Sequence, residues 1–564
     1  MLHYEIKLDP NTGEEWIETG LRGKALLTTF LLNKGTAFSY EERCSLGLLG
    51  KLPMKIETLE EQVRRAYRQY QKYKTNIQRN IYLNSLHDKS ETLFYKLLSD
   101  HLEEMLPMVY TPAVGQAVKQ FSHEFRQARG LYIAYPDADK IDIILNNRTN
   151  PDIEVIVVTD GERVLGLGDQ GVGGMDIPIA KLMLYTACAG INPYKTLPIM
   201  LDVGTNNPRL LRDPLYLGWR HGRIKGPEYD AFIDRFVQTV KKQLPGVLLQ
   251  WEDFGRDNAR RLLEKYRYTL CSFNDDMQGT AVVTLSAILT GVRRSGIGLT
   301  EQRIVIFGAG TAGVGIADQL VFAMEREGLT RQEAKKRLWL VDKEGLLNSQ
   351  MTLVDFQRPY VRDDMSACEN LLAVVRNVKP SLLIGCSSVR GAFTEEIIKI
   401  MANSTKYPII LPLSNPNEQS EAHPNDLLAW TNGQALIATG SPFQEVVYQG
   451  KKMQVAQSNN ALCFPGLGLG VVVSRAKWIS DNMLWAAVQA LTQYTLLHAK
   501  GDEEHRLLPS LKNAREVAKH VAFQVAEAAR EEGLAQFLPI ETYQTLIEKV
   551  MWEPYYRPIR PKEG

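Results

Sequence analysis

The sequence of 564 residues predicts an α/β protein that is built from several domains. The chain is too long for one hydrophobic core. Residues 57–129 have the periodicity of helices, and beyond Pro151 short runs rich in β-branched residues alternate with helical stretches. Such alternation is typical of parallel sheets covered by helices. We therefore expect an N-terminal helical domain followed by two α/β domains.

The helical region contains two local signals. Thr58 and Glu61 have the spacing of a capping box, in which each side chain binds the backbone N–H of the other residue. Pro107 and Pro112 flank the segment MVYT, and proline disfavours the interior of a helix. This places Tyr110 on a turn between two helices.

The strand candidates form two series. The first series contains residues 153–159, 197–203 and 247–251, with helical stretches at 179–189 and 228–243. The pair Asp160-Gly161 after the first run predicts a tight hairpin turn into ERVLGLG. The second series begins near Asn274, and its strand candidates are residues 304–307, 338–341, 382–384, 409–413 and 436–439. The last hundred residues return to a helical pattern.

The pattern GxGxxG occurs twice, at residues 166–171 and 308–313. The second match lies between a strand and a helix, and Asp342 ends the next strand, where an acid can bind the adenosine ribose. We therefore predict a Rossmann-type domain in which Gly308, Gly310, Gly313 and Asp342 bind a dinucleotide. The alternative is close helix–strand packing without a ligand. The first match follows a hairpin strand and is interpreted as a tight loop that enters a helix.

The residues after Asp342 bear on the choice between NAD and NADP. The 2′-phosphate of NADP needs cationic partners. Lys343 is followed at once by Glu344, whose charge would repel that phosphate. The sequence therefore favours NAD.

Two acidic pairs directly follow strand candidates. Glu252-Asp253 follows VLLQW, and Asp275-Asp276 follows CSFN. Because the carboxyl ends of parallel strands meet at one edge of a sheet, such carboxylates can converge there. Hard oxygen donors without a nearby Cys or His cluster suit Mg2+ or Mn2+. Adjacent acids in loops are also commonly solvated or cap helices, so both interpretations stay open.

Two basic residues are candidates for catalysis or substrate binding. Lys181 lies in the apolar helical stretch DIPIAKLMLYTA, where it is either a lysine whose amine snorkels to solvent or a buried general base. Arg163 follows the Asp160-Gly161 pair. It is either an exposed arginine on a strand or a partner for a substrate carboxylate.

Composition and charge exclude other classes of protein. The net charge of +1 and the lack of a basic run argue against nucleic-acid binding. Apolar runs fall short of the ~20 residues that span a bilayer. The six cysteines are scattered without a CxxC pair, and the acidic N-terminus resembles neither a signal nor a transit peptide. We expect a cytoplasmic protein.

Eleven segments between Phe30 and about Arg557, in the same order, together resemble malic enzymes. The segments are FLLNKGTAFSYEER, LPMVYTPAVG, VIVVTDGERVLGLGDQGVGGM, PIAKLMLYTACAGI, MLDVGTNN, LLQWEDF, SFNDDMQGTA, FGAGTAG, PLSNP, ATGSPF and SNNALCFPGLGLG. The resemblance implies oxidation of L-malate with NAD and Mg2+ or Mn2+, and decarboxylation of the product to pyruvate and CO2. It also implies decarboxylation of oxaloacetate as a side activity, and a tetramer that is a dimer of dimers.

The resemblance also implies roles for single residues. Tyr110 would protonate C3 of enolpyruvate, and Lys181, assisted by Asp275, would accept the proton of the malate hydroxyl. Arg163 would hold a substrate carboxylate and approach the nicotinamide. The implied metal ligands are Glu252, Asp253 and Asp276, of which Asp276 also lies near the cofactor. The implied contacts to malate or the nicotinamide ribose are Asn415 with Asn459 or Asn460.

The predicted domains are four. They are an N-terminal helical domain (1–128), an α/β substrate and metal domain (129–274, completed by 460–535), the Rossmann-type NAD-binding domain (275–459) and a C-terminal tail (536–564). One departure from the family is Ser388, where its members usually have glycine in a loop near the cofactor. Two other functions stay open: a malolactic enzyme, which forms lactate from malate, and a non-catalytic NAD-binding regulator.

Overall fold

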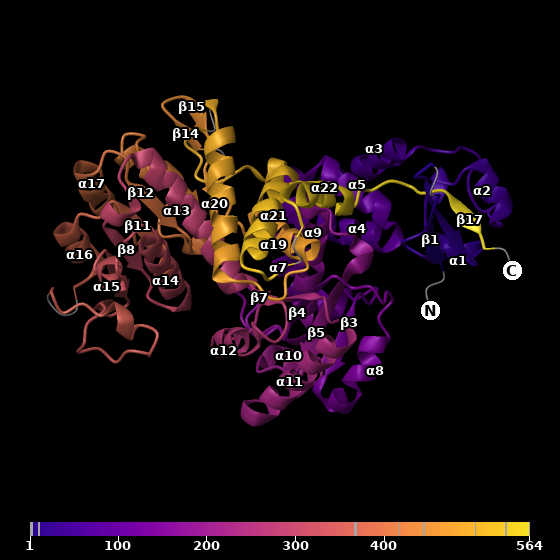
Figure 1. Cartoon of the computed structure of the whole chain (residues 1–564), viewed down its shortest axis with the longest axis horizontal. Helices are drawn as coiled ribbons and strands as arrows, with labels where there is room; N and C mark the ends of the chain where they lie inside the picture. The colour runs from indigo at the N-terminus through magenta and orange to yellow at the C-terminus, as the bar shows by residue number, and fades with distance from the viewer. Residues whose placement is uncertain are drawn as a thin grey trace. The chain divides into compact units, whose positions relative to one another are not determined.

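The computed structural model describes residues 4–9, 12–365, 369–415, 417–443, 446–501, 504–535 and 538–562. The chain divides into two compact units. The first comprises Met1–Ser272 and Thr545–Gly564, and the second comprises Phe273–Gln544. Each unit contains a sheet with parallel strands and flanking helices, which confirms the predicted α/β class (Figure 1). The four-domain division stays a prediction. No helix in the described part of the chain has both the length and the apolar character to cross a membrane.

The first unit begins with helices where the sequence predicts them. The helices are α3 (Leu59–Tyr70), α4 (Asn76–Lys89), α5 (Glu91–Asp100), α6 (Leu102–Val109) and α7 (Ala113–Glu124). The capping box of Thr58 and Glu61 is present at the start of α3. Helix α6 continues through Pro107 for two residues, and Tyr110 follows as its C-cap. Tyr110 therefore lies between two helices, as predicted.

A small sheet pairs strands from near both ends of the chain, and no pattern in the sequence predicts it. Its strand order is β1 (Tyr4–Leu8), β2 (Glu15–Thr19) and β17 (Ile559–Pro561). Strand β17 pairs in parallel with β2, so that Ile559 is opposite Ile17. Residues so far apart in the sequence leave no local signal of their pairing.

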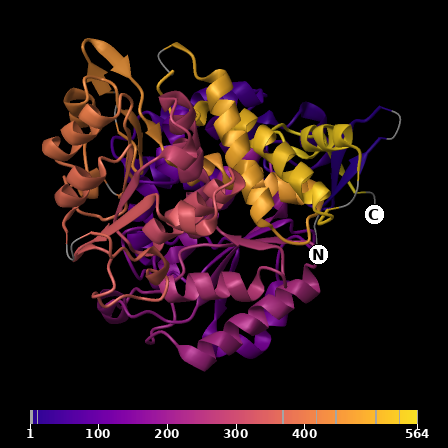
Figure 2. The same ribbon diagram turned by 60° about the vertical axis from the view of Figure 1, so that its left-hand side comes forward.

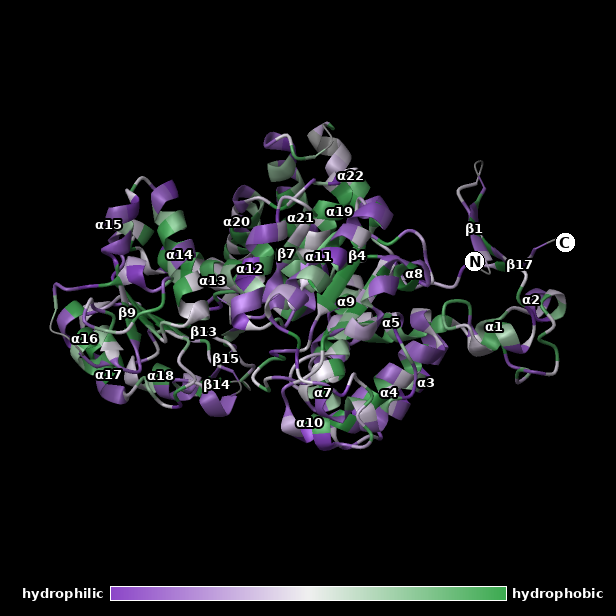
Figure 3. Ribbon diagram, turned by 90° about the horizontal axis from the view of Figure 1, so that it is seen from below, coloured by the Kyte–Doolittle hydropathy of each residue, from purple (hydrophilic) through white to green (hydrophobic). Residues whose placement is uncertain are grey.

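The strands of the main sheet in the first unit have the order β3-β5-β4-β6. They are β3 (Leu131–Ala134), β5 (Thr196–Asp202), β4 (Val155–Thr159) and β6 (Leu248–Trp251). All residues of β4 are buried, and its hydrophobic character is visible in Figure 3. Strand β4 pairs in parallel with both β5 and β6. Helix α9 (Asp176–Ala189) packs against β4 and β5.

The hairpin predicted after β4 is absent from the described residues, so this prediction is wrong. Gly161 has a positive φ of 66°, as a turn requires, but the chain after it forms a loop with one bridge between Val164 and Gly168. The physical reason is that β5 and β6 occupy both edges of β4. No edge is left for an antiparallel partner.

The second unit contains a sheet with the order β10-β9-β8-β11-β12-β13-β16. All five predicted strands are present as β8 (Ile304–Phe307), β9 (Leu338–Asp342), β11 (Leu382–Gly385), β12 (Ile409–Pro412) and β13 (Leu436–Thr439). These five run parallel to one another. The order reverses between β8 and β11, which is the topological switch point of a doubly wound fold. The Rossmann-type prediction is therefore confirmed.

Helices cover both faces of this sheet. One face packs against α16 (Leu371–Val378), α17 (Glu395–Ser404) and α18 (Pro424–Trp430). The other face meets α13 (Thr280–Ser295), whose Gly291 lies against Ile409, and α14 (Thr311–Arg326). The C-terminal helices α19 (Phe464–Ser474), α20 (Asp481–His498) and α21 (Ala514–Glu531) pack on one another, as Figures 1 and 2 show in orange to yellow. This confirms the helical prediction for the last part of the chain.

Candidate active site

Lys181 and Glu252 form a buried ion pair in the first unit. Lys181, on α9, is 1% exposed, and its Nζ lies 2.9 Å from Oε1 of Glu252, which directly follows β6. The amine therefore does not snorkel to solvent. Removing two charges from water is costly, and a buried pair persists when its partners and hydrogen bonds compensate for that cost.

Two further polar residues support this ion pair. Gln250 Nε2 donates a 2.7 Å hydrogen bond to Oε2 of Glu252, and Tyr185 OH donates one of 2.7 Å to Gln250 Oε1. Tyr185 is one helical turn after Lys181, and Gln250 is on the same face of β6 as Glu252. Sequence reasoning missed both residues, although their i,i+4 and i,i+2 spacings carry the signal.

Tyr110 lies beside the same lysine. Nζ of Lys181 is 5.2 Å from the centre of the Tyr110 ring, and Tyr110 is 7% exposed. A cation at this distance is attracted to the face of the ring. The two residues predicted to move protons thus come together from α9 and from the turn between α6 and α7.

Asp253 turns the chain at the end of β6. Its φ is +56°, a left-handed conformation that costs most residues about 1–2 kcal/mol. Successive residues of a strand point to opposite faces. The turn at Asp253 instead brings a carboxylate oxygen within 4.8 Å of one of Glu252. Both carboxylates are buried, and together they offer hard oxygen donors for a divalent cation.

The backbone of Asp253 and a buried arginine fix the loop that carries Arg163. The N–H of Arg163 donates to the carbonyl of Asp253 at 3.1 Å. Arg223 binds both ends of the loop: it donates two bonds to the Asp169 carboxylate at 2.8 and 2.9 Å and one of 2.9 Å to the carbonyl of Asp160. Burial raises the pKa of Asp160 to about 6, and the charge of Arg223 opposes that rise. The side chain of Arg163 is exposed on this fixed loop.

The glycine-rich turn of the second unit has the geometry of a dinucleotide site. Gly308 has a φ of +105°, and a Cβ there would lie 2.5 Å from the carbonyl carbon of Cys386. A Cβ on Gly313 would lie 2.0 Å from the carbonyl oxygen of Gly308, whereas a Cβ on Gly310 would meet no atom within 4 Å. The backbone therefore requires glycine at two positions and leaves open space at the third. That space adjoins the N-terminus of α14, where anions are favoured.

Asp342 ends β9 as predicted, and Gln357 connects it to this turn. Nε2 of Gln357 donates to the carbonyl of Ala309 at 2.8 Å and to Oδ2 of Asp342 at 3.3 Å. Gln357 carried no sequence signal, because it lies in an irregular segment beyond the strand. Glu344 is exposed.

Asp275 and Asn460 come together in the second unit. Asp275 is fully buried, and Asn460 Nδ2 donates to its carbonyl oxygen and to Oδ2, both at 3.1 Å. The side chain of Asn459 instead accepts a bond from the N–H of Ala461. Asp276 is exposed in the π-helical turn Asp275–Gly279. Asn415 is exposed after β12, and the hydroxyl of Ser441 donates to its Oδ1.

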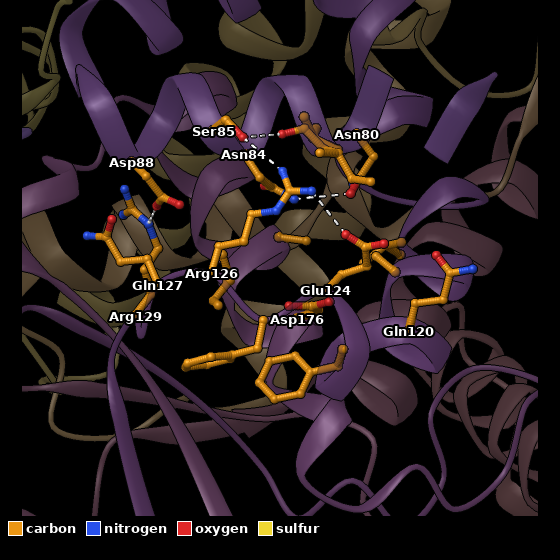
Figure 4. A pocket seen from close by; sticks show the side chains of 18 of the residues that line it. Asn80, Asn84, Ser85, Asp88, Gln120, Glu124, Arg126, Gln127, Arg129 and Asp176 are labelled. Carbon is orange, nitrogen blue, oxygen red and sulfur yellow. Dashed lines mark hydrogen bonds and ion pairs between the residues drawn. The ribbon is translucent and has the colours of Figure 1, made fainter. Parts of the chain in front are cut away.

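Two other features lie apart from these groups. The first GxGxxG match forms a loop that enters α9 through the turn Gly171–Met175, as interpreted from the sequence. A cavity of about 110 Å3 lies on the face of α9 that bears Asp176, Ile179, Ala180 and Met183 (Figure 4). Lys181 does not line this cavity, so the cavity does not belong to the candidate site.

Comparisons with known proteins identify relatives of both units. Residues 87–267 match the family model described as malic enzyme, N-terminal domain, and residues 277–530 match malic enzyme, NAD binding domain. The chain is 49% identical over 544 residues to the NAD-dependent malic enzyme of Vibrio campbellii, covering 95% of this chain and 96% of that protein. It is 52% identical over 547 residues to that of Sodalis glossinidius, with coverages of 95% and 96%.

Solved structures show the same fold. The malic enzyme of Entamoeba histolytica has a TM-score of 0.56 at 22% identity, over 92% of this chain and 91% of that one. The malic enzyme of Pyrococcus horikoshii has a TM-score of 0.52 at 24% identity, over 79% of this chain and 89% of that one. At these identities the likeness concerns the fold alone.

Proposed function

Since this chain belongs to the malic enzyme family, we propose that it oxidises L-malate with NAD and decarboxylates the product to pyruvate and CO2. The observation that carries the proposal is the buried group of Lys181, Glu252 and Tyr110. It unites a base, a carboxylate and a proton donor in one unit, and the second unit supplies a dinucleotide fold. A binding-only regulator would have no use for such a group, so we favour catalysis over that alternative.

Lys181 and Tyr110 would each move one proton. Lys181 would accept the proton of the C2 hydroxyl as malate is oxidised, because its amine is buried and is held in one position. The ion pair with Glu252 favours the ammonium form, so Lys181 would become a base once the Glu252 carboxylate serves as a metal ligand instead. Tyr110 gives a proton to C3 of enolpyruvate after CO2 has left. Arg163 holds a substrate carboxylate from its fixed loop, and Asp275 assists Lys181. NAD, when bound, accepts the hydride from C2.

A divalent cation fits the carboxylates at the end of β6. We propose that Glu252 and Asp253, with Asp276, hold Mg2+ or Mn2+, because hard oxygen donors suit these ions. A bound ion supplies Lewis-acid polarisation of the C2 oxygen. Decarboxylation of oxaloacetate is expected as a side activity for the same reason.

The second unit would bind NAD along the carboxyl edge of its sheet. Asp342 holds the adenosine ribose, and Glu344 disfavours a 2′-phosphate. Asn415 contacts the nicotinamide ribose or malate. Of the two neighbouring asparagines, Asn460 contacts Asp275, which favours it over Asn459 for this role. We also propose a homotetramer in the cytoplasm.

The test is absorbance at 340 nm with purified protein, L-malate, Mn2+ and either NAD or NADP, followed by assays for pyruvate and lactate. We expect reduction of NAD with an equal amount of pyruvate, and loss of both in EDTA. Lactate without net reduced cofactor would favour the malolactic enzyme. Absence of turnover with either cofactor would contradict a catalytic role.

Lys181→Ala separates chemistry from cofactor binding. We expect malate oxidation to fall by at least about 10^2-fold, the range for loss of a general base, with the dissociation constant of NAD unchanged. The matched control is Lys241→Ala on the exposed face of α11 (Gly226–Gln243), which should keep full activity. Normal turnover in Lys181→Ala would remove this lysine from the mechanism.

A further inference from the structure

Glu421 is a buried carboxylate at the carboxyl edge of the sheet in the second unit. It is fully buried, and among the described residues no ion pair with it is seen. A carboxylate without a counter-ion is costly inside a protein unless hydrogen-bond donors surround it. Gly385, the last residue of β11, makes room for it, because a Cβ there would lie 2.5 Å from Cδ of Glu421.

Four donors from two loops satisfy this carboxylate. Ser387, after β11, donates to Oε1 through its N–H and its hydroxyl, both at 2.9 Å. Ser414, after β12, donates to Oε1 through its hydroxyl at 2.5 Å and to Oε2 through its N–H at 3.3 Å. Hydrogen bonds to an ionised acceptor are about twice as strong as neutral ones. Glu421 therefore fastens the two loops to each other.

The loops that Glu421 connects both belong to one half of the fold. In a doubly wound sheet each half binds one mononucleotide. The half with β8 and β9 contains the glycine-rich turn and Asp342, which are adenosine-side features, so the loops after β11 and β12 adjoin the nicotinamide half. The loop after β12 also carries Asn415, next to Ser414. The N–H of Cys386 donates to the carbonyl of Phe307 at 2.7 Å, so the first residue of the β11 loop is tied to β8 without Glu421.

We propose that Glu421 is a positioning residue for the nicotinamide half of NAD, which it serves by holding the loops after β11 and β12 at a fixed separation. The inference rests on the function proposed above. Loss of the carboxylate should let these loops separate while the adenosine side keeps its shape. A purely structural role would weaken both halves alike.

The experiment compares NAD with AMP, which reports the adenosine half alone. Dissociation constants of both are measured by isothermal titration calorimetry on the full-length protein. For Glu421→Gln we expect the constant for NAD to rise about tenfold or more, because a charged acceptor is lost, while that for AMP stays within about twofold. Equal weakening of NAD binding and AMP binding, or no change in either dissociation constant, would overturn the proposal.

Two control variants test whether the effect of Glu421→Gln is specific. Glu418→Gln changes an exposed glutamate three residues away and should alter neither constant. Gln357→Leu breaks the bridge between Ala309 and Asp342 on the adenosine side, and it should weaken AMP and NAD together.

A milder variant covers the case in which Glu421→Gln does not fold. Ser414→Ala removes one donor to Glu421 and, with it, the acceptor of the Ser388 N–H, so it should weaken NAD binding by a few-fold without changing AMP binding. Equal effects on NAD and AMP would again overturn the proposal. Wild-type protein that binds AMP but not NAD would instead contradict the proposed function itself.

Discussion

Ser388 occupies a backbone conformation that glycine adopts at no cost. Its φ is +58°, and its N–H donates to the hydroxyl of Ser414 at 2.8 Å. Glycine adopts this left-handed conformation without strain, which accounts for the glycine that the family resemblance predicts here. The hydrogen bond to Ser414 helps to hold Ser388 in this conformation. The serine therefore introduces backbone strain that the loop after β11 tolerates.

Ser388→Gly should therefore stabilise the protein. The left-handed conformation costs an ordinary residue about 1–2 kcal/mol, and the extra chain entropy of glycine offsets roughly 0.5–1 kcal/mol of the gain. We expect a net increase of about 0.5–1 kcal/mol in the free energy of unfolding, measured by urea denaturation. Ser404→Gly, in the last turn of α17, is the control and should destabilise, because its backbone is helical. A loss of stability in Ser388→Gly would show that the serine side chain makes a favourable contact.

Individual residues differ in how far the sequence could predict them. Asp342 was predictable because its role depends on its place at the end of a strand that follows a glycine motif. Gln357 and Glu421 were not, since each acts through hydrogen bonds to loops that are distant in the sequence. A buried glutamine or glutamate has no local pattern that distinguishes it from an exposed one.

At the scale of elements, the strand–turn–helix unit from β8 to α14 was predicted in full. Its three glycines share one motif but not one role. Gly313 is required by contact with the carbonyl of Gly308, whereas Gly310 borders open space. Sequence alone could not separate packing from ligand binding here, because both interpretations require glycine.

Gly310→Val and Gly313→Val should consequently have different effects. We expect Gly310→Val to keep its stability and to lose NAD binding, because its side chain fills the space that the pyrophosphate needs. Gly313→Val should destabilise by about 1–3 kcal/mol through overpacking. Thermal unfolding and calorimetric titration with NAD check both. Unchanged NAD binding in Gly310→Val would place the pyrophosphate elsewhere.

Helix α9 begins with an acid whose ionisation opposes folding. Burial raises the pKa of Asp176 from its ordinary value of 3.8 to about 7, in the cavity shown in Figure 4. In the folded state Asp176 keeps a proton that it releases in the unfolded chain. The contribution of the protonated carboxyl to stability is full below pH 3.8 and is lost as the pH rises through 7. Stability should therefore fall between about pH 4 and pH 7.

Asp176→Asn should remove this dependence. We expect the urea midpoint of the variant to exceed that of the wild type by more at pH 8 than at pH 5, where part of the contribution of the protonated Asp176 remains. The matched control is Asp257→Asn, an exposed acid in the first turn of α12 (Arg256–Tyr266), which should leave the difference between the two pH values unchanged. An identical pH profile in Asp176→Asn would show that Asp176 ionises freely in the folded protein.

At the scale of the whole molecule, the predicted class and both sheets are present, but long-range pairings were missed. The period of hydrophobic residues and the turn residues predict where strands lie. They do not indicate which edge of a strand is free to pair with another strand. The hairpin after β4 failed for that reason, because β5 and β6 take both of its edges. The pairing of β17 with β2 joins positions at opposite ends of the chain, where no window of sequence contains both.

The two GxGxxG matches give a test that involves the whole molecule, because one lies in each unit. NAD should protect backbone amides most where it binds, and hydrogen–deuterium exchange with mass spectrometry reads every segment at once. We expect the greatest slowing of exchange around residues 308–313 and 386–390, in the second unit. Residues 166–171 should be slowed less, since that loop follows no strand of a dinucleotide fold. The greatest protection at residues 166–171 would reverse the assignment of the two motifs. Gly310→Val serves as the control, because in that variant NAD should slow exchange in neither segment.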